Sequence, residues 1–150
     1  MYQRLYVPVD DSETANLSLT EAARFTQACG AQLRVVHVSD FAQFGWGGAE
    51  YLDPAELKES VQEAGIAILD NAKIRLAELG ASAEMVLLES WGESIADKLV
   101  ADADQWRADL IMMGTHGWGE LKHLLLGSVV EGVLKHSSIP VILLRIQSKK

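Results

Sequence analysis

Cysteine and long apolar runs are both scarce in this sequence of 150 residues. Cys29 is the only cysteine, so the chain cannot form an internal disulfide, and nothing in it favours an oxidising compartment. No apolar run approaches the roughly 18 residues that a helix needs to cross a bilayer. The first residues also lack the apolar stretch of a signal peptide. We therefore expect a cytoplasmic protein that does not insert into a membrane.

Positive charge is scarce too, since 13 lysines and arginines stand against 21 aspartates and glutamates. The formal net charge of −8 repels the phosphate backbone of nucleic acids and the surface of anionic membranes. We therefore expect no nucleic-acid partner. A small anionic ligand remains compatible with this charge, provided that backbone N–H groups supply a local positive site.

Two common phosphate-binding motifs are missing. No glycine is followed by lysine anywhere in the chain, which excludes a P-loop of the Walker type. The dinucleotide fingerprint requires glycines directly after the first strand, and no glycine lies between Met1 and Cys29. Any nucleotide site must therefore use another loop.

The pattern of hydrophobic residues indicates one domain of alternating strands and helices, covering residues 1–150. Its 49% hydrophobic and 23% charged residues are typical of a globular domain. Apolar, β-branched runs predict strands, and amphipathic stretches predict helices. The expected strands cover 5–9, 33–38, 83–88, 109–113 and 140–145; the expected helices cover 15–29, 54–79, 92–105 and 128–136; and a loop is expected over 39–53.

Strands that are apolar throughout, rather than at every second residue, are buried on both faces. Their alternation with helices favours parallel pairing through right-handed crossovers. The sequence therefore predicts a three-layer, doubly wound α/β fold. Ligands of such folds bind beyond the carboxyl ends of the strands, where the strand order reverses. We expect the site in the loops after the first and fourth strands.

The loop after the fourth predicted strand is rich in glycine. It fits the pattern G-x2-G-x9-G-S at Gly114, Gly117, Gly127 and Ser128. Glycine lets the backbone approach a ligand closely. Ser128 is expected to cap the following helix, whose free N–H groups form an anion site. The loop therefore supplies a flat backbone surface and a place for phosphate.

Two adjacent carboxylates, Asp10 and Asp11, follow the first predicted strand and are candidate ligands for Mg²⁺. Receiver domains also have an acidic pair in this loop, but they need an aspartate after the third strand and a lysine after the fifth. Here Glu89 and Arg145 stand in those regions. The sequence therefore does not favour a receiver domain.

Taken together, these motifs make the chain similar to the universal stress protein family, in its ATP-binding branch. The resemblance extends over essentially the whole sequence. Asp11 is a departure, because the family often has glycine after the first-strand aspartate. The matching motifs are VPVDDSE (7–13), VVHV (35–38), MGTHG (113–117), GSV (127–129) and SIPVILLR (138–145).

This resemblance implies a nucleotide site and a role for each matching residue. Asp10 would contact the ribose or adenine end, and Met113 would lie along the pocket. The other implied residues are Gly127, Ser128 and Val129 at the phosphates, Gly114 and Gly117 along the ribose and phosphates, and Pro8, Val9 and Val38 beside the base.

The resemblance further implies the strand order 3-2-1-4-5 of the adenine nucleotide alpha hydrolase-like fold. Its functional implication is an ATP-binding regulatory sensor of the stress response that acts as a homodimer, with ATP bound alone or with Mg²⁺. The dimer would form through the fifth strand, Pro140 to Arg145, because a bare apolar edge strand is prone to aggregate. The alternative is a slow ATP hydrolase, or another ATP-using enzyme, on the same fold.

Overall fold

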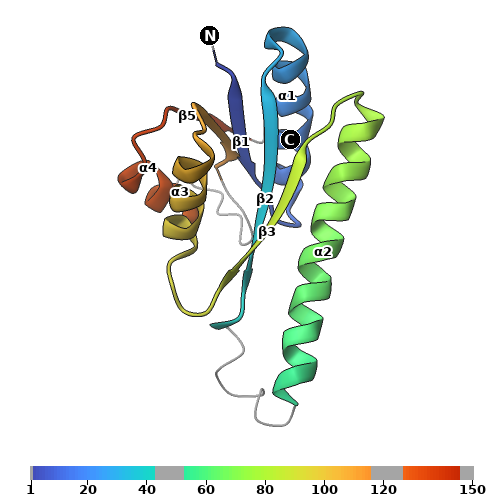
Figure 1. Cartoon of the computed structure of the whole chain (residues 1–150), viewed down its shortest axis with the longest axis vertical. Helices are drawn as coiled ribbons and strands as arrows, with labels where there is room; N and C mark the ends of the chain where they lie inside the picture. The colour runs from blue at the N-terminus through green and yellow to red at the C-terminus, as the bar shows by residue number, and fades with distance from the viewer. Residues whose placement is uncertain (1, 43–52, 116–126, 146–150) are drawn as a thin grey trace, which may run out of the picture.

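The computed structural model describes residues 2–42, 53–115 and 127–145, and within them strands and helices alternate (Figure 1). The five strands are parallel and lie in the order β3-β2-β1-β4-β5, as predicted. The elements are β1 (Arg4–Pro8), α1 (Glu13–Cys29), β2 (Gln32–Asp40), α2 (Pro54–Glu78), β3 (Glu84–Ser90), α3 (Ile95–Trp106), β4 (Leu110–Gly114), α4 (Ser128–His136) and β5 (Val141–Leu144).

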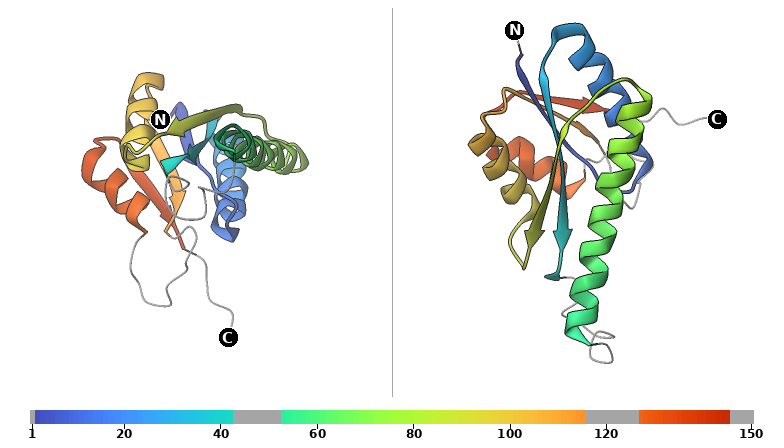
Figure 2. Two further views of the ribbon diagram at one scale, coloured as in Figure 1. Left: turned by 90° about the horizontal axis from the view of Figure 1, so that it is seen from below. Right: turned by 45° about the vertical axis from the view of Figure 1, so that its right-hand side comes forward.

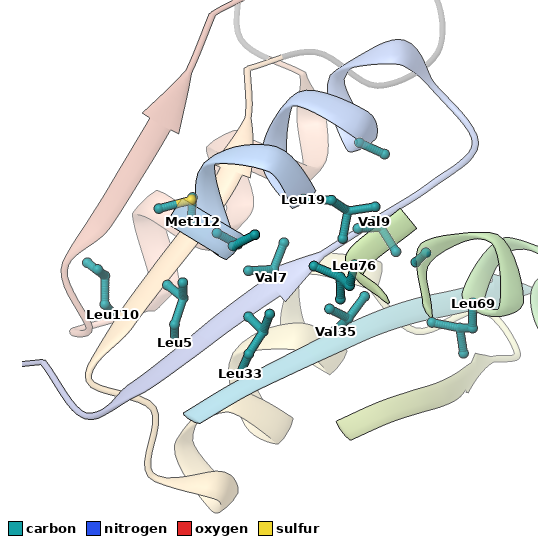
Figure 3. Close-up of a cluster of buried hydrophobic side chains, with 14 residues drawn as sticks. Leu5, Val7, Val9, Leu19, Leu33, Val35, Leu69, Leu76, Leu110 and Met112 are labelled. Carbon is teal, nitrogen blue, oxygen red and sulfur yellow. The ribbon is translucent and has the colours of Figure 1, made fainter. Parts of the chain in front are cut away.

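Helices cover both faces of the sheet, α1 and α2 on one face and α3 and α4 on the other (Figures 1 and 2). Successive side chains of a strand point to opposite faces, so each strand contributes to two cores. Leu5 and Val7 of β1 pack with Leu19 of α1 and Leu76 of α2 (Figure 3). Tyr6, between them in sequence, belongs to the core under α3 and α4. The predicted three-layer fold is confirmed.

A buried polar cluster lies at the amino end of the sheet. Tyr6 is fully buried, and its hydroxyl donates to Asp102 Oδ2 of α3 at 2.9 Å. Arg34 Nη1 forms an ion pair with the same carboxylate, at 3.2 Å from Oδ1. Burial of Tyr6, reinforced by the Asp102 charge, raises the pKa of its phenol well above the ordinary value. Tyr6 therefore stays neutral and ties β1 to α3.

Most element boundaries differ from the prediction by one to three residues, and two of these differences have a clear structural cause. Helix α3 begins at Ile95 rather than at residue 92, because Ser94 caps it and Gly92 adopts a φ of +115° in the preceding turn. Strand β2 continues past Val38 to Asp40, since Asp40 still pairs with Ser90 of β3. The first two residues of the expected 39–53 loop are therefore strand.

Helix α2 is long, but charged and polar residues are distributed along its whole length. No helix within the described ranges is both long enough and apolar enough to cross a membrane.

Candidate functional site

A cavity of about 340 Å³ opens at the carboxyl ends of β1, β2 and β4. The strand order reverses here, because β1 connects to β2 on one side and lies beside β4 on the other. Doubly wound sheets bind their ligands at this position, and the volume is within the range of small-molecule sites. The segment after the first strand and the described ends of the loop after the fourth strand therefore meet at one cavity.

Most of the residues singled out from the sequence line this cavity. Gly117 lies outside the described residues, so its position is not part of the site described here. The predicted residues on the cavity wall are Pro8, Val9, Asp10, Val38, Met113, Gly114, Gly127, Ser128 and Val129.

One wall of the cavity is apolar. Val36 and Val38 come from β2, Met113 from β4, and Ile95 and Leu99 from the first turns of α3. Ile95 and Leu99 are four residues apart, which places them on the same side of the helix. Ile95, Leu99 and Val36 were not predicted from the sequence to line the site. Together these side chains form a surface suited to an aromatic ring.

The first turn of α4 forms another part of the cavity lining. Gly127 is the N-cap, with φ −64° and ψ 155°, and no side chain caps the helix. The expectation that Ser128 is the cap is therefore wrong, because the helix begins one residue earlier than a serine cap requires. The first N–H groups of a helix have no intrahelical acceptor, and no described residue accepts from those of Ser128 and Val129, so this turn offers donors to the cavity.

Gly127 is itself anchored at both of its backbone groups. Its N–H donates to the Thr115 carbonyl at 3.1 Å, and its carbonyl accepts from Glu131 N at 3.0 Å. Among the described residues, the nearest atom to a Cβ at Gly127 would be that Thr115 carbonyl oxygen, at 3.6 Å. The space beside Gly127 is therefore open to a ligand.

Gly114 differs from Gly127, because it is already in close contact with α1. A Cβ at Gly114 would lie 2.6 Å from Cβ of Thr14, which is too close for two carbon atoms. Packing of β4 against α1 therefore requires glycine here, in addition to any contact that Gly114 makes with a ligand.

Asp10 points its carboxylate into a small hydrogen-bonded turn at the cavity. Its Oδ1 accepts from Ser12 N at 2.8 Å and also from the Ser12 hydroxyl, which in turn lies 2.8 Å from Thr14 Oγ1. Both bonds use the same oxygen, which fixes the carboxylate and leaves Oδ2 for another partner. Asp11 is exposed and lies in a separate hollow between α1 and α2. Of the acidic pair, only Asp10 lines the main cavity.

His37 and Asp40 of β2 also line the cavity and were not assigned to it from the sequence. His37 Nδ1 donates to the Val9 carbonyl at 2.8 Å, which holds the end of β1 against β2. Asp40 is half-buried, and its Oδ1 accepts from Ala42 N at 3.0 Å. The carboxylates in the described lining of the cavity are those of Asp10 and Asp40, and that lining contains no lysine or arginine.

A metal site made by the protein alone is not found in the described part of the chain. No three residues among its histidines, cysteines, aspartates and glutamates are arranged to hold an ion. Mg²⁺ usually keeps several waters and binds through one or two carboxylates together with substrate phosphates. The fixed carboxylate of Asp10 fits that kind of shared coordination.

The sheet order and the position of the cavity define an adenine nucleotide alpha hydrolase-like fold. Residues 1–145 match the universal stress protein family, and the chain belongs to it.

Solved structures of relatives agree with this assignment. The universal stress protein MJ0577 of Methanocaldococcus jannaschii is 29% identical with a TM-score of 0.81, and the match covers 99% of each chain. A universal stress protein from Archaeoglobus fulgidus, solved in complex with dAMP, is 26% identical with a TM-score of 0.68, covering 95% of this chain and 97% of that one. A third universal stress protein, solved in complex with cAMP, is 26% identical with a TM-score of 0.66, and the match covers 96% of this chain and 97% of that one.

Proposed function

We propose that this protein is an ATP-binding universal stress protein, which acts as a cytoplasmic homodimer and a nucleotide sensor in regulation. The observation that carries the proposal is a single cavity whose described lining combines apolar side chains of β2, β4 and α3 with the N-terminal turn of α4. An adenine ring and a phosphate chain need those two environments. Two relatives of the same fold were solved with dAMP and with cAMP.

In this proposal the predicted residues keep the roles given to them by the family resemblance. The phosphates bind at the N–H groups of Gly127, Ser128 and Val129, where the helix dipole favours negative charge. Asp10 contacts the ribose or adenine end, and its carboxylate would also help to hold a Mg²⁺ ion carried by the phosphates. The base lies against Val38 and the other apolar residues of β2, β4 and α3.

Electrostatics supports a metal-bound form of the nucleotide. A triphosphate brings several negative charges to a cavity whose described lining already carries two carboxylates and no cationic side chain. The backbone N–H groups of α4 offset only part of this charge, since a helix N-terminus carries about half an elementary charge. Mg²⁺ bound to the phosphates lowers the remaining repulsion.

Isothermal titration calorimetry with ATP, ADP and AMP, each with and without Mg²⁺, tests the proposal. We expect one nucleotide per chain, with a Kd well below about 1 mM, which corresponds to about −4 kcal/mol. Absence of binding at millimolar nucleotide would contradict it. Phosphate release measured in the same samples separates the sensor from the alternative of a slow hydrolase, because only the hydrolase releases phosphate over many turnovers.

The homodimer is the second part of the proposal. Strand β5 is an edge of the sheet, and its four residues, Val141–Leu144, are all apolar and all half-buried. Pairing of β5 with its copy about a two-fold axis would cover this edge.

A further inference from the structure

Asp40 occupies a defined place at one end of the cavity. The residues of β2 alternate between the two faces of the sheet, so Val36, Val38 and Asp40 point to the same side. All three line the cavity. The free N–H groups of α4 lie beyond β4, and β1 separates β4 from β2. Asp40 is therefore at the end of the cavity away from the helix N-terminus and next to the apolar wall.

The carboxylate of Asp40 is held in place but not neutralised. Oδ1 accepts from Ala42 N at 3.0 Å, which fixes the side chain against the backbone. No described lysine or arginine forms an ion pair with it, and no described donor bonds to its Oδ2. Val38 and Phe41 beside it are 8% and 7% exposed. A half-buried acceptor in apolar surroundings favours a ligand that brings an N–H donor.

We propose that Asp40 accepts a hydrogen bond from the exocyclic 6-amino group of the base and makes this site selective for 6-aminopurines. The inference rests on the proposed nucleotide-binding function and names the residue that selects the base. A 6-oxo purine in the same position would bring a carbonyl oxygen towards the carboxylate. Two acceptors then face each other without a proton between them, which rejects the wrong base by repulsion as well as by a lost bond.

The size of the effect follows from the chemistry of the contact. A hydrogen bond to a charged group changes affinity by about ten- to a hundredfold. Asparagine at this position keeps the size of the side chain and an oxygen for Ala42 N, but its amide can also donate to a 6-oxo group. Alanine removes the acceptor altogether. Asp40→Ala therefore tests the loss of the contact with the 6-amino group, and Asp40→Asn tests the loss of discrimination between a 6-amino and a 6-oxo group.

Calorimetry with three probes tests the inference: ATP, its 6-desamino analogue purine riboside triphosphate, and the 6-oxo analogue ITP. In the wild-type protein we expect ATP to bind about ten- to a hundredfold more tightly than either analogue. In Asp40→Ala, ATP and the desamino analogue should bind with equal affinity. In Asp40→Asn, the preference for ATP over ITP should fall to near unity.

The control is Asp70→Asn, which removes an exposed carboxylate of α2 and should leave all three affinities unchanged. Equal binding of ATP and the desamino analogue by the wild-type protein would overturn the inference while leaving the proposed function intact. So would an Asp40→Ala protein that still prefers ATP by the wild-type ratio. Failure of the wild-type protein to bind any of the three probes would instead overturn the proposed function, and this inference with it.

Discussion

The carboxylate of Asp10 illustrates how single residues set the chemistry of the cavity. Its Oδ1 accepts two hydrogen bonds from Ser12, whereas no described donor bonds to Oδ2. A negative charge beside a polyphosphate repels it unless a cation lies between them. We therefore expect Asp10 to favour ATP binding through a metal ion and not by direct contact with the phosphates.

Replacing Asp10 by asparagine should reduce the gain in ATP affinity that Mg²⁺ provides. The amide retains an oxygen for Ser12 but loses the charge that attracts the metal, so ATP should bind almost equally with and without Mg²⁺. Calorimetry in the two buffers measures this ratio. Asp11→Asn is the matched control, since Asp11 is exposed outside the cavity and should keep the wild-type ratio. A full Mg²⁺ effect in Asp10→Asn would contradict the assignment.

The hydrogen bond of Tyr6 to Asp102 should contribute to the stability of the protein, and this contribution should depend on pH. Tyr6→Phe removes the hydrogen bond to Asp102 and should lower the free energy of unfolding by about 1.5–3 kcal/mol at neutral pH. Because folding raises the pKa of this phenol, the contribution is complete below pH 10.0, the ordinary value in the unfolded chain. Above that pH the unfolded chain ionises while the folded one does not, so the contribution is lost as pH rises.

Urea unfolding of both proteins between pH 7 and pH 11 checks this expectation. The difference in unfolding free energy between wild type and Tyr6→Phe should be constant up to about pH 10 and shrink above it. A difference that stayed constant through pH 11 would show that Tyr6 is not neutral in a buried bond.

At the scale of elements, the position of α4 depends on its close packing against α3. A Cβ at Gly132 would lie 2.5 Å from Cβ of Ala96, an atom that cannot rotate away. The two helices therefore meet through a glycine and an alanine. Since the first turn of α4 provides the N–H groups at the cavity, this packing also places the proposed phosphate site.

Gly132→Ala should consequently destabilise the protein, although alanine is the better helix former by about 1 kcal/mol. Overpacking of a tight contact costs about 1–3 kcal/mol, and relieving it requires α4 to move away from α3. Chemical denaturation measures the change. Adding Ala96→Gly removes the opposing carbon and should recover much of the lost stability. A stabilised Gly132→Ala single variant would contradict the packing described here.

The order of the elements could be predicted from the sequence, because each apolar run and each amphipathic stretch forms one strand or helix. The end of β2 could not. The apolar pattern stops at Val38, whereas Ser39 and Asp40 are polar and extend the strand only because β3 lies beside them. Long-range pairing of this kind leaves no local signal, so Asp40 was assigned to a loop and missed as a cavity residue.

The bounds of α4 were predicted correctly as 128–136, but its N-cap is Gly127 and not Ser128. Glycine and serine are both common N-cap residues, so the pair Gly127-Ser128 does not show which of them is the cap. Ile95 and Leu99 were missed for a different reason. Their spacing indicates a helix face, but the packing of α3 on the sheet decides that part of this face borders the cavity.

At the scale of the whole molecule, the proposed assembly is testable by mass. Sedimentation equilibrium should give twice the 16.4 kDa mass of one chain at micromolar concentration. We expect this because pairing along β5 covers apolar residues that a monomer would leave at an open sheet edge. A single 16.4 kDa species at every concentration up to the millimolar range would contradict the homodimer.

The central claim is that a nucleotide binds with its phosphates at the first turn of α4. Calorimetric titration of Gly127→Val with Mg-ATP tests it most directly, because a Cβ at this position meets no described atom closer than 3.6 Å and the φ of −64° is one that valine tolerates. We expect Gly127→Val to bind ATP at least tenfold more weakly than the wild-type protein while still unfolding cooperatively. The added methyl groups would fill the place of the phosphates. Unchanged ATP affinity in a folded Gly127→Val protein would contradict the account.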